Sequence, residues 1–239
     1  MRFLASIKYF VGRNARYIPF LPALRRMIAP PGDAVEFQTS DQYWKDRYKK
    51  GGNSGEGSYG PLARYKAEFI NDFCRRNGVG SAVEFGCGDG NQASMLDIRS
   101  YLGVDISEDC IEWARKNIRK PNWRFETLAE YLGSEHEAAE LGLSLDVIYH
   151  LVEDETYASY LQNLCDSASR FLLIYASNLD AYNPEVPHVR HRTVIADVER
   201  LHPQWGFVRT EQNPLAIDHD NDREYGSFAH FHVFEKRAA

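Results

Sequence analysis

An acidic residue followed by alternating glycines is the feature of the sequence with the clearest chemical meaning. Glu84 precedes three glycines at every second position, Gly86, Gly88 and Gly90. Glycines let a backbone turn sharply and approach a ligand closely, at the end of a strand where folds of alternating strands and helices bind their ligands. A dinucleotide fingerprint needs another glycine where this chain has Asn91, to seat a pyrophosphate. The pattern therefore favours a ligand without phosphate that carries a positively charged amino-acid part.

The segment Glu84–Gly90 resembles motif I of class I methyltransferases, which use S-adenosylmethionine, and Gly103-Val104-Asp105 resembles their second motif. The resemblance covers roughly residues 60–235. It implies S-adenosylmethionine as cofactor. Many members of this family hold the adenine amino group with an acid after the third strand. Residues 126–128 contain no clear counterpart, so the adenine edge is left unassigned.

The resemblance also implies a role for each residue of the cofactor site. Glu84 would orient the methionine end of the cofactor, and Gly86 and Gly88 would pass beneath it. Asp105, at the end of a strand, would accept hydrogen bonds from both ribose hydroxyls, with Ile106 against the adenine.

Hydrophobic patterning around these motifs predicts alternating strands and helices. The expected strands are Ala82–Phe85, Tyr101–Ile106, Trp123–Phe125, Leu145–Tyr149, Phe171–Tyr175, Phe207–Gln212 and Ser227–Glu235. Helical patterns separate the first five, which indicates crossover units and a parallel sheet, whereas the last two are joined without a helix. We therefore predict an α/β, Rossmann-like doubly wound fold with a seven-stranded, mostly parallel sheet. Its last strand is antiparallel, and an N-terminal helical extension precedes it.

A histidine and two carboxylates follow the expected fourth strand, on the side where the resemblance places the transferred methyl group. They are His150, Glu153 and Asp154. A hydroxyl acceptor loses a proton on methylation and gains from a general base or a metal ion. His150 is thus the first candidate for a base. The alternatives are a buried structural histidine and a ligand, with Glu153 or Asp154, of a divalent metal.

A second group of polar residues follows the expected fifth strand, within residues 187–192. His188 and His191 are further candidates for a base or a ligand, and Arg190 and Arg192 are candidates to pair with an anionic substrate. The alternative is a basic surface loop without a role in catalysis.

Charge divides the chain into an N-terminal arm and an acidic remainder. The 239 residues carry a net charge of -6 with a pI of about 5.8, which argues against a nucleic-acid partner. Residues 1–32 are instead basic, with an amphipathic pattern. This arm is expected to pack on the domain, to form a homodimer, or to contact a membrane surface or a glycosyltransferase. Four cysteines without Cys-x-x-Cys spacing suit a cytoplasmic protein, peripheral at the inner membrane surface if the arm binds there.

Between the arm and the predicted core of residues 81–239, residues 33–80 predict a glycine-rich lid for substrate and cofactor, followed by a leading helix. The part from Tyr43-Trp44 to Gly60, with Lys66, resembles a bacterial methyltransferase group associated with glycans. The leading hypothesis is therefore an O-methyltransferase acting on a sugar or glycan hydroxyl, the glycan lipid-linked if the arm binds a membrane. The alternatives are methylation of a small secondary metabolite, a nicotinamide-dependent oxidoreductase, and a non-catalytic relative that binds a partner.

Overall fold

Seven strands form one sheet in the order β3-β2-β1-β4-β5-β9-β8, in a computed structural model that describes residues 37–216 and 226–238. The strands of this sheet are β1 (Ser81–Phe85), β2 (Ser100–Asp105), β3 (Trp123–Thr127), β4 (Ala139–Leu145), β5 (Ala168–Ala176), β8 (Trp205–Glu211) and β9 (His230–Lys236). β1 to β5 pair in parallel, and β9 is antiparallel to both β5 and β8. The predicted fold class, with its antiparallel last strand, is confirmed.

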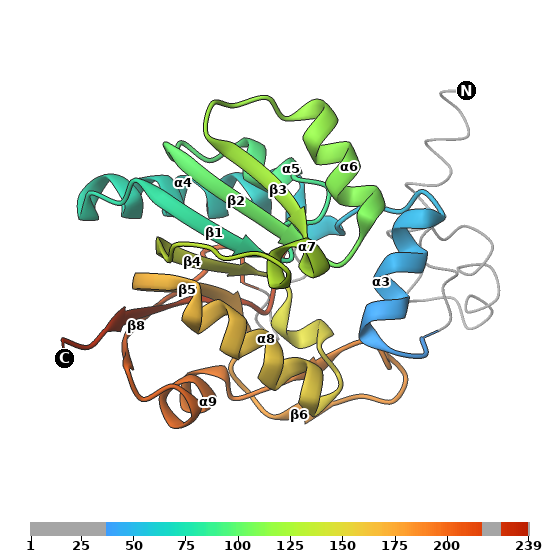
Figure 1. The fold of residues 1–239 in the computed structure, drawn as a ribbon. Helices are drawn as coiled ribbons and strands as arrows, with labels where there is room; N and C mark the ends of the chain where they lie inside the picture. Colours follow the sequence, from blue (N-terminus) through green and yellow to red (C-terminus); the bar gives the residue numbers. More distant parts are fainter. Residues whose placement is uncertain (1–36, 217–225, 239) are drawn as a thin grey trace.

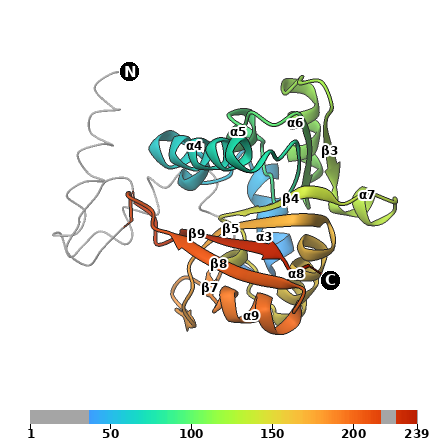
Figure 2. The ribbon, with the colours of Figure 1, turned by 90° about the vertical axis from the view of Figure 1, so that its left-hand side faces the viewer.

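Helices cover both faces of this sheet. They are α3 (Ser40–Lys49), α4 (Gly60–Asn77), α5 (Asn91–Ser94), α6 (Glu108–Asn117), α7 (Leu128–Leu132), α8 (Asp154–Asp166) and α9 (Val194–Leu201). Two short 3-10 helices, η2 (Glu56–Ser58) and η3 (Ile148–His150), and a small hairpin of β6 (Ala181–Tyr182) and β7 (Arg190–His191) complete the described elements. Helices α4, α5 and α6 lie on one face, and α8 and α9 lie on the other (Figure 2). Helix α3 stands apart from both layers, at the carboxyl ends of β1, β2 and β3 (Figure 1).

The helix ends follow from the sequence. Pro61 occupies the first turn of α4, and Gly78 ends it in the left-handed conformation with φ 63°. Both are the residues that favour those positions. The Ser107 hydroxyl accepts a hydrogen bond from the amide of Cys110 and caps α6.

The predicted strand Leu145–Tyr149 is wrong, because β4 ends at the residue with which that prediction began. Asp146 has φ 62°, which lies outside the β region, and η3 begins two residues later. The apolar residues Val147, Ile148 and Tyr149 suggested a continuing strand, although they belong to a tight turn. His150 consequently lies at the end of this turn, with its amide bonded to the carbonyl of Val147 at 2.8 Å.

An ion pair fixes this turn to α4. The Nζ of Lys66, a fully buried side chain, donates to the Oδ2 of Asp146, and the Tyr149 hydroxyl donates to the Oδ1 at 2.7 Å. The Lys66 ammonium also lies 5.2 Å from the centre of the Tyr175 ring in β5. The carboxylate of Asp146 and the aromatic ring of Tyr175 thus offset the free-energy cost of burying the Lys66 ammonium.

The predicted N-terminal arm, residues 1–32, lies outside the described residues, and its membrane, partner and dimer contacts stay predictions. Within the described ranges, no helix is long and apolar enough to cross a membrane. The four cysteines are buried free thiols.

Replacing Lys66 tests the importance of this ion pair. Lys66→Met should lower the free energy of unfolding by about 3 kcal/mol, the lower end of the range for breaking a buried pair, because Asp146 keeps some access to water. Arg75→Met is the matched control, because its partner Asp72 is solvent-exposed, and it should cost less than about 1 kcal/mol. Urea unfolding followed by circular dichroism measures both. Equal losses in the two variants would show that the Lys66 pair adds nothing specific.

Candidate functional site

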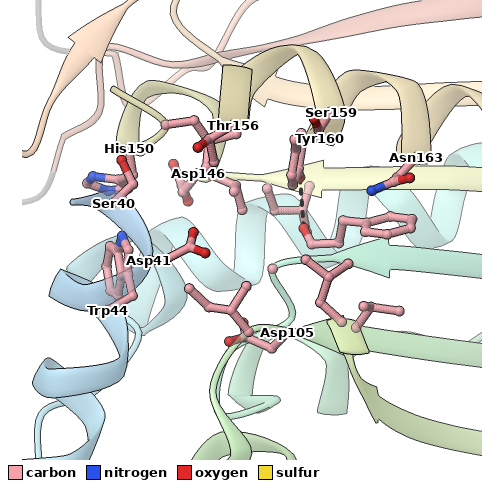
Figure 3. A pocket seen from close by; sticks show the side chains of 18 of the residues that line it. Ser40, Asp41, Trp44, Asp105, Asp146, His150, Thr156, Ser159, Tyr160 and Asn163 are labelled. Carbon is pink, nitrogen blue, oxygen red and sulfur yellow. Dashed lines mark hydrogen bonds between the residues drawn. The ribbon is translucent and has the colours of Figure 1, made fainter. Parts of the chain in front are cut away.

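A cavity of about 380 Å³ lies at the carboxyl ends of the parallel strands, between α3 and α8. Strand ends and the turns after them contribute Phe85, Gly86, Val104, Asp105, Ile106, Leu128, Leu145, Asp146, Val147, His150 and Leu151. The residues from α3 and the segment after it are Ser40, Asp41, Trp44, Tyr48, Ser54 and Ser58, and those from α8 are Glu155, Thr156, Ser159, Tyr160 and Asn163. Figure 3 shows side chains from these three directions converging on one space.

The glycine-rich loop has the close backbone approaches that its sequence predicts. The amide of Gly86 donates to the carbonyl of Val104 in β2 at 2.7 Å, and Gly86 itself lines the cavity with φ 79°. A side chain at Gly86 would collide with Val147, and one at Gly88 would collide with Ser54. Gly90 has φ 73° and precedes α5, outside the lining residues. Gly86 is thus the glycine of the three that faces the cavity.

Asp105 ends β2 with its carboxylate at the cavity. One oxygen accepts the amide of Gly88 at 2.9 Å and the other accepts the amide of Ser107 at 2.9 Å. A carboxylate has about four acceptor positions, so each oxygen can accept a further hydrogen bond from a ligand hydroxyl. Burial raises the pKa of Asp105, although these amides oppose the shift. Ile106 also lines the cavity beside Asp105, as the adenine contact would require.

Glu84 lies one layer behind the cavity. Its side chain is buried and accepts a hydrogen bond from the hydroxyl of Tyr101 at 2.5 Å. Burial raises the pKa of Glu84 to about 7, against the opposing effects of Tyr101 and Lys66. Its predicted contact with the methionine end of a cofactor stays a prediction, because the carboxylate is not among the lining groups.

Asp146 is a lining residue whose importance the sequence did not reveal. It directly follows β4, carries the ion pair to Lys66, and lies between the glycine-rich loop and His150. Its place at the end of an apolar run could have indicated its importance, but the strand predicted at Leu145–Tyr149 ran through it. The polar residues of α8 that line the cavity recur with helical spacing and were also missed. Asp41 had no sequence signal, because its position depends on how α3 packs, whereas Trp44 belongs to the segment that resembles the glycan-associated group.

His150 lines the cavity with one ring nitrogen already engaged. Its Nδ1 lies 3.1 Å from the carbonyl oxygen of His188, so Nδ1 must carry the proton of the neutral ring. The other nitrogen, Nε2, is then the acceptor. Burial lowers the pKa of His150 to about 4, and the ring is neutral at pH 7. The Trp44 ring contacts it edge-on at 4.8 Å between centroids.

The structure brings the three predicted histidines together, but only His150 is among the cavity-lining residues. The rings of His150 and His188 are 6.0 Å apart, and His188 stacks on Tyr43 at 4.8 Å. The Nδ1 of His191 is hydrogen-bonded to the hydroxyl of Ser177 at 2.7 Å, and burial lowers the pKa of His191. His188 therefore acts on the cavity through His150, whose ring it orients with its carbonyl.

The carboxylates predicted as possible metal ligands and the arginines predicted to bind an anionic substrate form ion pairs or hydrogen bonds within the protein. Asp154 pairs with Arg192 at 2.6 Å and with Arg190 at 3.0 Å, and Glu153 accepts the amide of Ser40 at 3.0 Å. The two guanidinium groups would oppose a metal cation at Asp154, and the described residues contain no group of three or more side chains suited to hold a metal. Arg192 is buried and donates to the carbonyl oxygens of Leu151 and Val152, so it is not available to an anionic substrate.

The glycine-rich segment after α3 packs directly on the cofactor loop. Ser54 and Asp89 exchange two hydrogen bonds, from the amide of Ser54 to the carboxylate and from the amide of Asp89 to the hydroxyl. The hydroxyl of Tyr59 donates to the same carboxylate at 2.5 Å, and Asn91 donates to the carbonyl of Ser58 at 2.6 Å. Residues 51–60 contain the short helix η2, and this segment packs on the cofactor loop.

Comparison with known proteins decides the general class of the site. Residues 82–170 match a family model described as a methyltransferase domain. The chain carries a methyltransferase domain. No curated protein matches it significantly in sequence. The match covers the glycine-rich loop, Asp105 and His150, and it favours a methyltransferase over the nicotinamide-dependent oxidoreductase.

Solved structures share the fold of this methyltransferase domain at low sequence identity. The N-methyltransferase NodS from Bradyrhizobium japonicum WM9, with S-adenosyl-L-homocysteine, has a TM-score of 0.64 at 15% identity, over 84% of this chain and 100% of NodS. Magnesium protoporphyrin IX methyltransferase from Synechocystis PCC 6803 gives 0.59 at 14%, over 82% and 98%. A SAM-dependent methyltransferase from Anabaena variabilis ATCC 29413 gives 0.59 at 15%, over 85% and 97%. The family match thus indicates a methyltransferase domain, and the solved structures share its fold.

Replacing Asp105 tests the cofactor site. Asp105→Ala should weaken S-adenosylmethionine binding at least ~10-fold, because two charge-assisted hydrogen bonds to ribose, at roughly 1.5–3 kcal/mol each, are lost. Isothermal titration calorimetry measures the affinity, and the melting temperature without ligand reports on folding. Asp109→Ala, on the first turn of α6 and outside the cavity, is the matched control. Unchanged affinity in Asp105→Ala would remove the ribose assignment.

Proposed function

We propose that this methyltransferase transfers a methyl group from S-adenosylmethionine to a hydroxyl of a sugar or glycan, with His150 as the general base. In this proposal Asp105 binds the ribose, Ile106 contacts the adenine, and Gly86 allows the methionine part to lie close to the backbone. The cofactor supplies an activated methyl group on a sulfonium. The protein positions this group and the acceptor in line, and it removes the proton of the acceptor.

The geometry of His150 is the observation that carries the proposal. The ring is held by the carbonyl of His188, so that Nε2 is the unprotonated nitrogen, and it lines the same cavity as Asp105. A ring whose pKa is about 4 is a weak base. Proton transfer to Nε2 is therefore expected to accompany the formation of the carbon–oxygen bond rather than to precede it.

A sugar acceptor is supported by the chemistry of the cavity wall. Hydroxyl and carboxamide groups of Thr156, Ser159 and Asn163 line one side of the cavity, and the indole of Trp44 lines another. Uncharged polar groups beside an aromatic ring suit a ligand with many hydroxyls and an apolar ring face. Mass spectrometry after incubation with S-adenosylmethionine and a panel of methyl glycosides tests this. Methylation of phenolic metabolites but of no glycoside would favour the small-molecule alternative.

Replacement of His150 distinguishes a base from a structural residue. As a base, His150→Ala should lower turnover by about 10²–10⁴ while cofactor affinity stays nearly unchanged. Wild-type turnover should decline on the acid side only as pH approaches 4, since Nε2 is unprotonated above that value. His191→Ala, whose ring lies outside the lining residues, is the comparison variant.

Folding must be followed in the same experiment. The pKa of His150 lies below its value in the unfolded chain, normally near ~6.5, so its contribution to stability falls as pH drops from there towards 4. Circular dichroism at each pH separates this loss from catalysis. Near-normal turnover of folded His150→Ala would show that His150 is not the base, and inhibition by a chelator would indicate a metal.

A further inference from the structure

Helix α3 is attached at both ends to the two halves of the site. Near its start, the hydroxyl of Ser40 accepts the amide of Val152 at 2.9 Å, two residues after His150. Near its end, the Tyr48 hydroxyl donates to Ser54 at 3.0 Å, and Ser54 is bonded to Asp89 in the cofactor loop. The helix therefore spans the distance between the predicted base and the cofactor loop, and its middle faces the cavity.

Two side chains of α3 face the cavity beside His150. Asp41 and Trp44 are three residues apart and share one side of the helix. Figure 3 shows the Asp41 carboxylate turned into the cavity between Trp44 and Asp105. Among the residues that the structure describes, none forms an ion pair or hydrogen bond with this carboxylate, and the Trp44 ring contacts that of His150. Asp41 and Trp44 thus offer a hydrogen-bond acceptor and an aromatic ring to a molecule beside the base.

Among the described residues, the charged side chains that line the cavity are all carboxylates, from Asp41, Asp105, Asp146 and Glu155. Arg47 lies outside this lining, over the Trp44 ring at 5.7 Å. Lys66 neutralises Asp146 from outside the lining, and S-adenosylmethionine brings a net single positive charge. Asp41 and Glu155 then leave an excess of negative charge among the described side chains that line the cavity. A phosphate or carboxylate on the acceptor would be repelled, whereas hydroxyls or an amine would find acceptors.

We propose that α3 forms the acceptor subsite, in which Asp41 accepts hydrogen bonds from the acceptor, Trp44 packs on its ring, and Asp41 excludes anionic acceptors. The substrate class is thereby narrowed to uncharged or amine-bearing sugars. This inference rests on the proposed function, because it assigns the acceptor end of the same cavity. It adds specificity-determining residues that the cofactor site does not require.

Matched sugars that differ in charge test this subsite. Methyl glucoside, glucosamine and glucuronate are titrated by NMR into the protein loaded with S-adenosylhomocysteine. The wild-type protein should bind glucuronate at least ~10-fold more weakly than methyl glucoside. Asp41→Asn should reduce this difference to about threefold or less, and Asp41→Lys should reverse the order. Trp44→Ala should weaken methyl glucoside and glucosamine by a similar factor, because its contact does not depend on charge.

The controls separate this inference from the proposed function. Asp46→Asn changes a carboxylate of the same helix that lies outside the cavity lining, and it should leave the order of the three sugars unchanged. An undiminished difference between glucuronate and methyl glucoside in Asp41→Asn would overturn the subsite alone. Binding of none of the three sugars by protein that binds S-adenosylhomocysteine would overturn the subsite together with the sugar acceptor of the proposed function. If S-adenosylhomocysteine itself does not bind, the proposed function fails together with the subsite.

Discussion

The ion pair between Lys66 and Asp146 is the interaction on which the geometry of the site depends. It holds Asp146 at φ 62°, a conformation that a residue other than glycine rarely adopts, and so it ends β4 abruptly. Val147 is then turned against Gly86, and η3 directs His150 to the cavity. Without this compensation, a strand that continued past Asp146 would carry His150 away from the position where it lines the cavity. A buried charge is costly, and here its cost is offset by a partner that also shapes the site.

The segment before the core completes the cavity from the opposite side. Helix α3 and η2 make polar contacts with the rest of the site, from Ser40 to the turn after η3 and from Ser54 and Tyr59 to Asp89, and α3 also contacts the rings of His150 and His188. Hydrogen bonds of this kind contribute about 1 kcal/mol each, much less than the burial of a large apolar side chain in the core. The core thus holds the cofactor loop rigidly, whereas the covering segment is held by interactions that are individually weak.

The sequence predicted the fold and the cofactor site better than the acceptor site. Gly86 and Asp105 lie in short local motifs that can be recognised directly from the sequence, and both line the cavity. Asp146 was missed because an apolar run does not show where a strand ends when an ion pair from a distant helix decides it. Asp41 was missed because it lines the cavity only after α3 has packed across the strand ends, whereas Trp44 belonged to a segment with a recognisable resemblance. Local patterns predict local structure, but contacts between distant elements decide which polar side chains meet.

The electrostatics of the cavity connect the cofactor with the base. The carboxylates of Asp41, Asp105 and Glu155 favour a positive charge in the cavity, while burial lowers the pKa of His150 and keeps its ring neutral at pH 7. In the proposed reaction, a sulfonium carries that charge before methyl transfer, and the imidazolium of His150 would carry it afterwards. The number of positive charges beside the carboxylates therefore stays constant during the reaction, and the lining need not reorganise. An anionic acceptor would add a negative charge to this arrangement, which is the physical reason why Asp41 and His150 suit the same uncharged substrate.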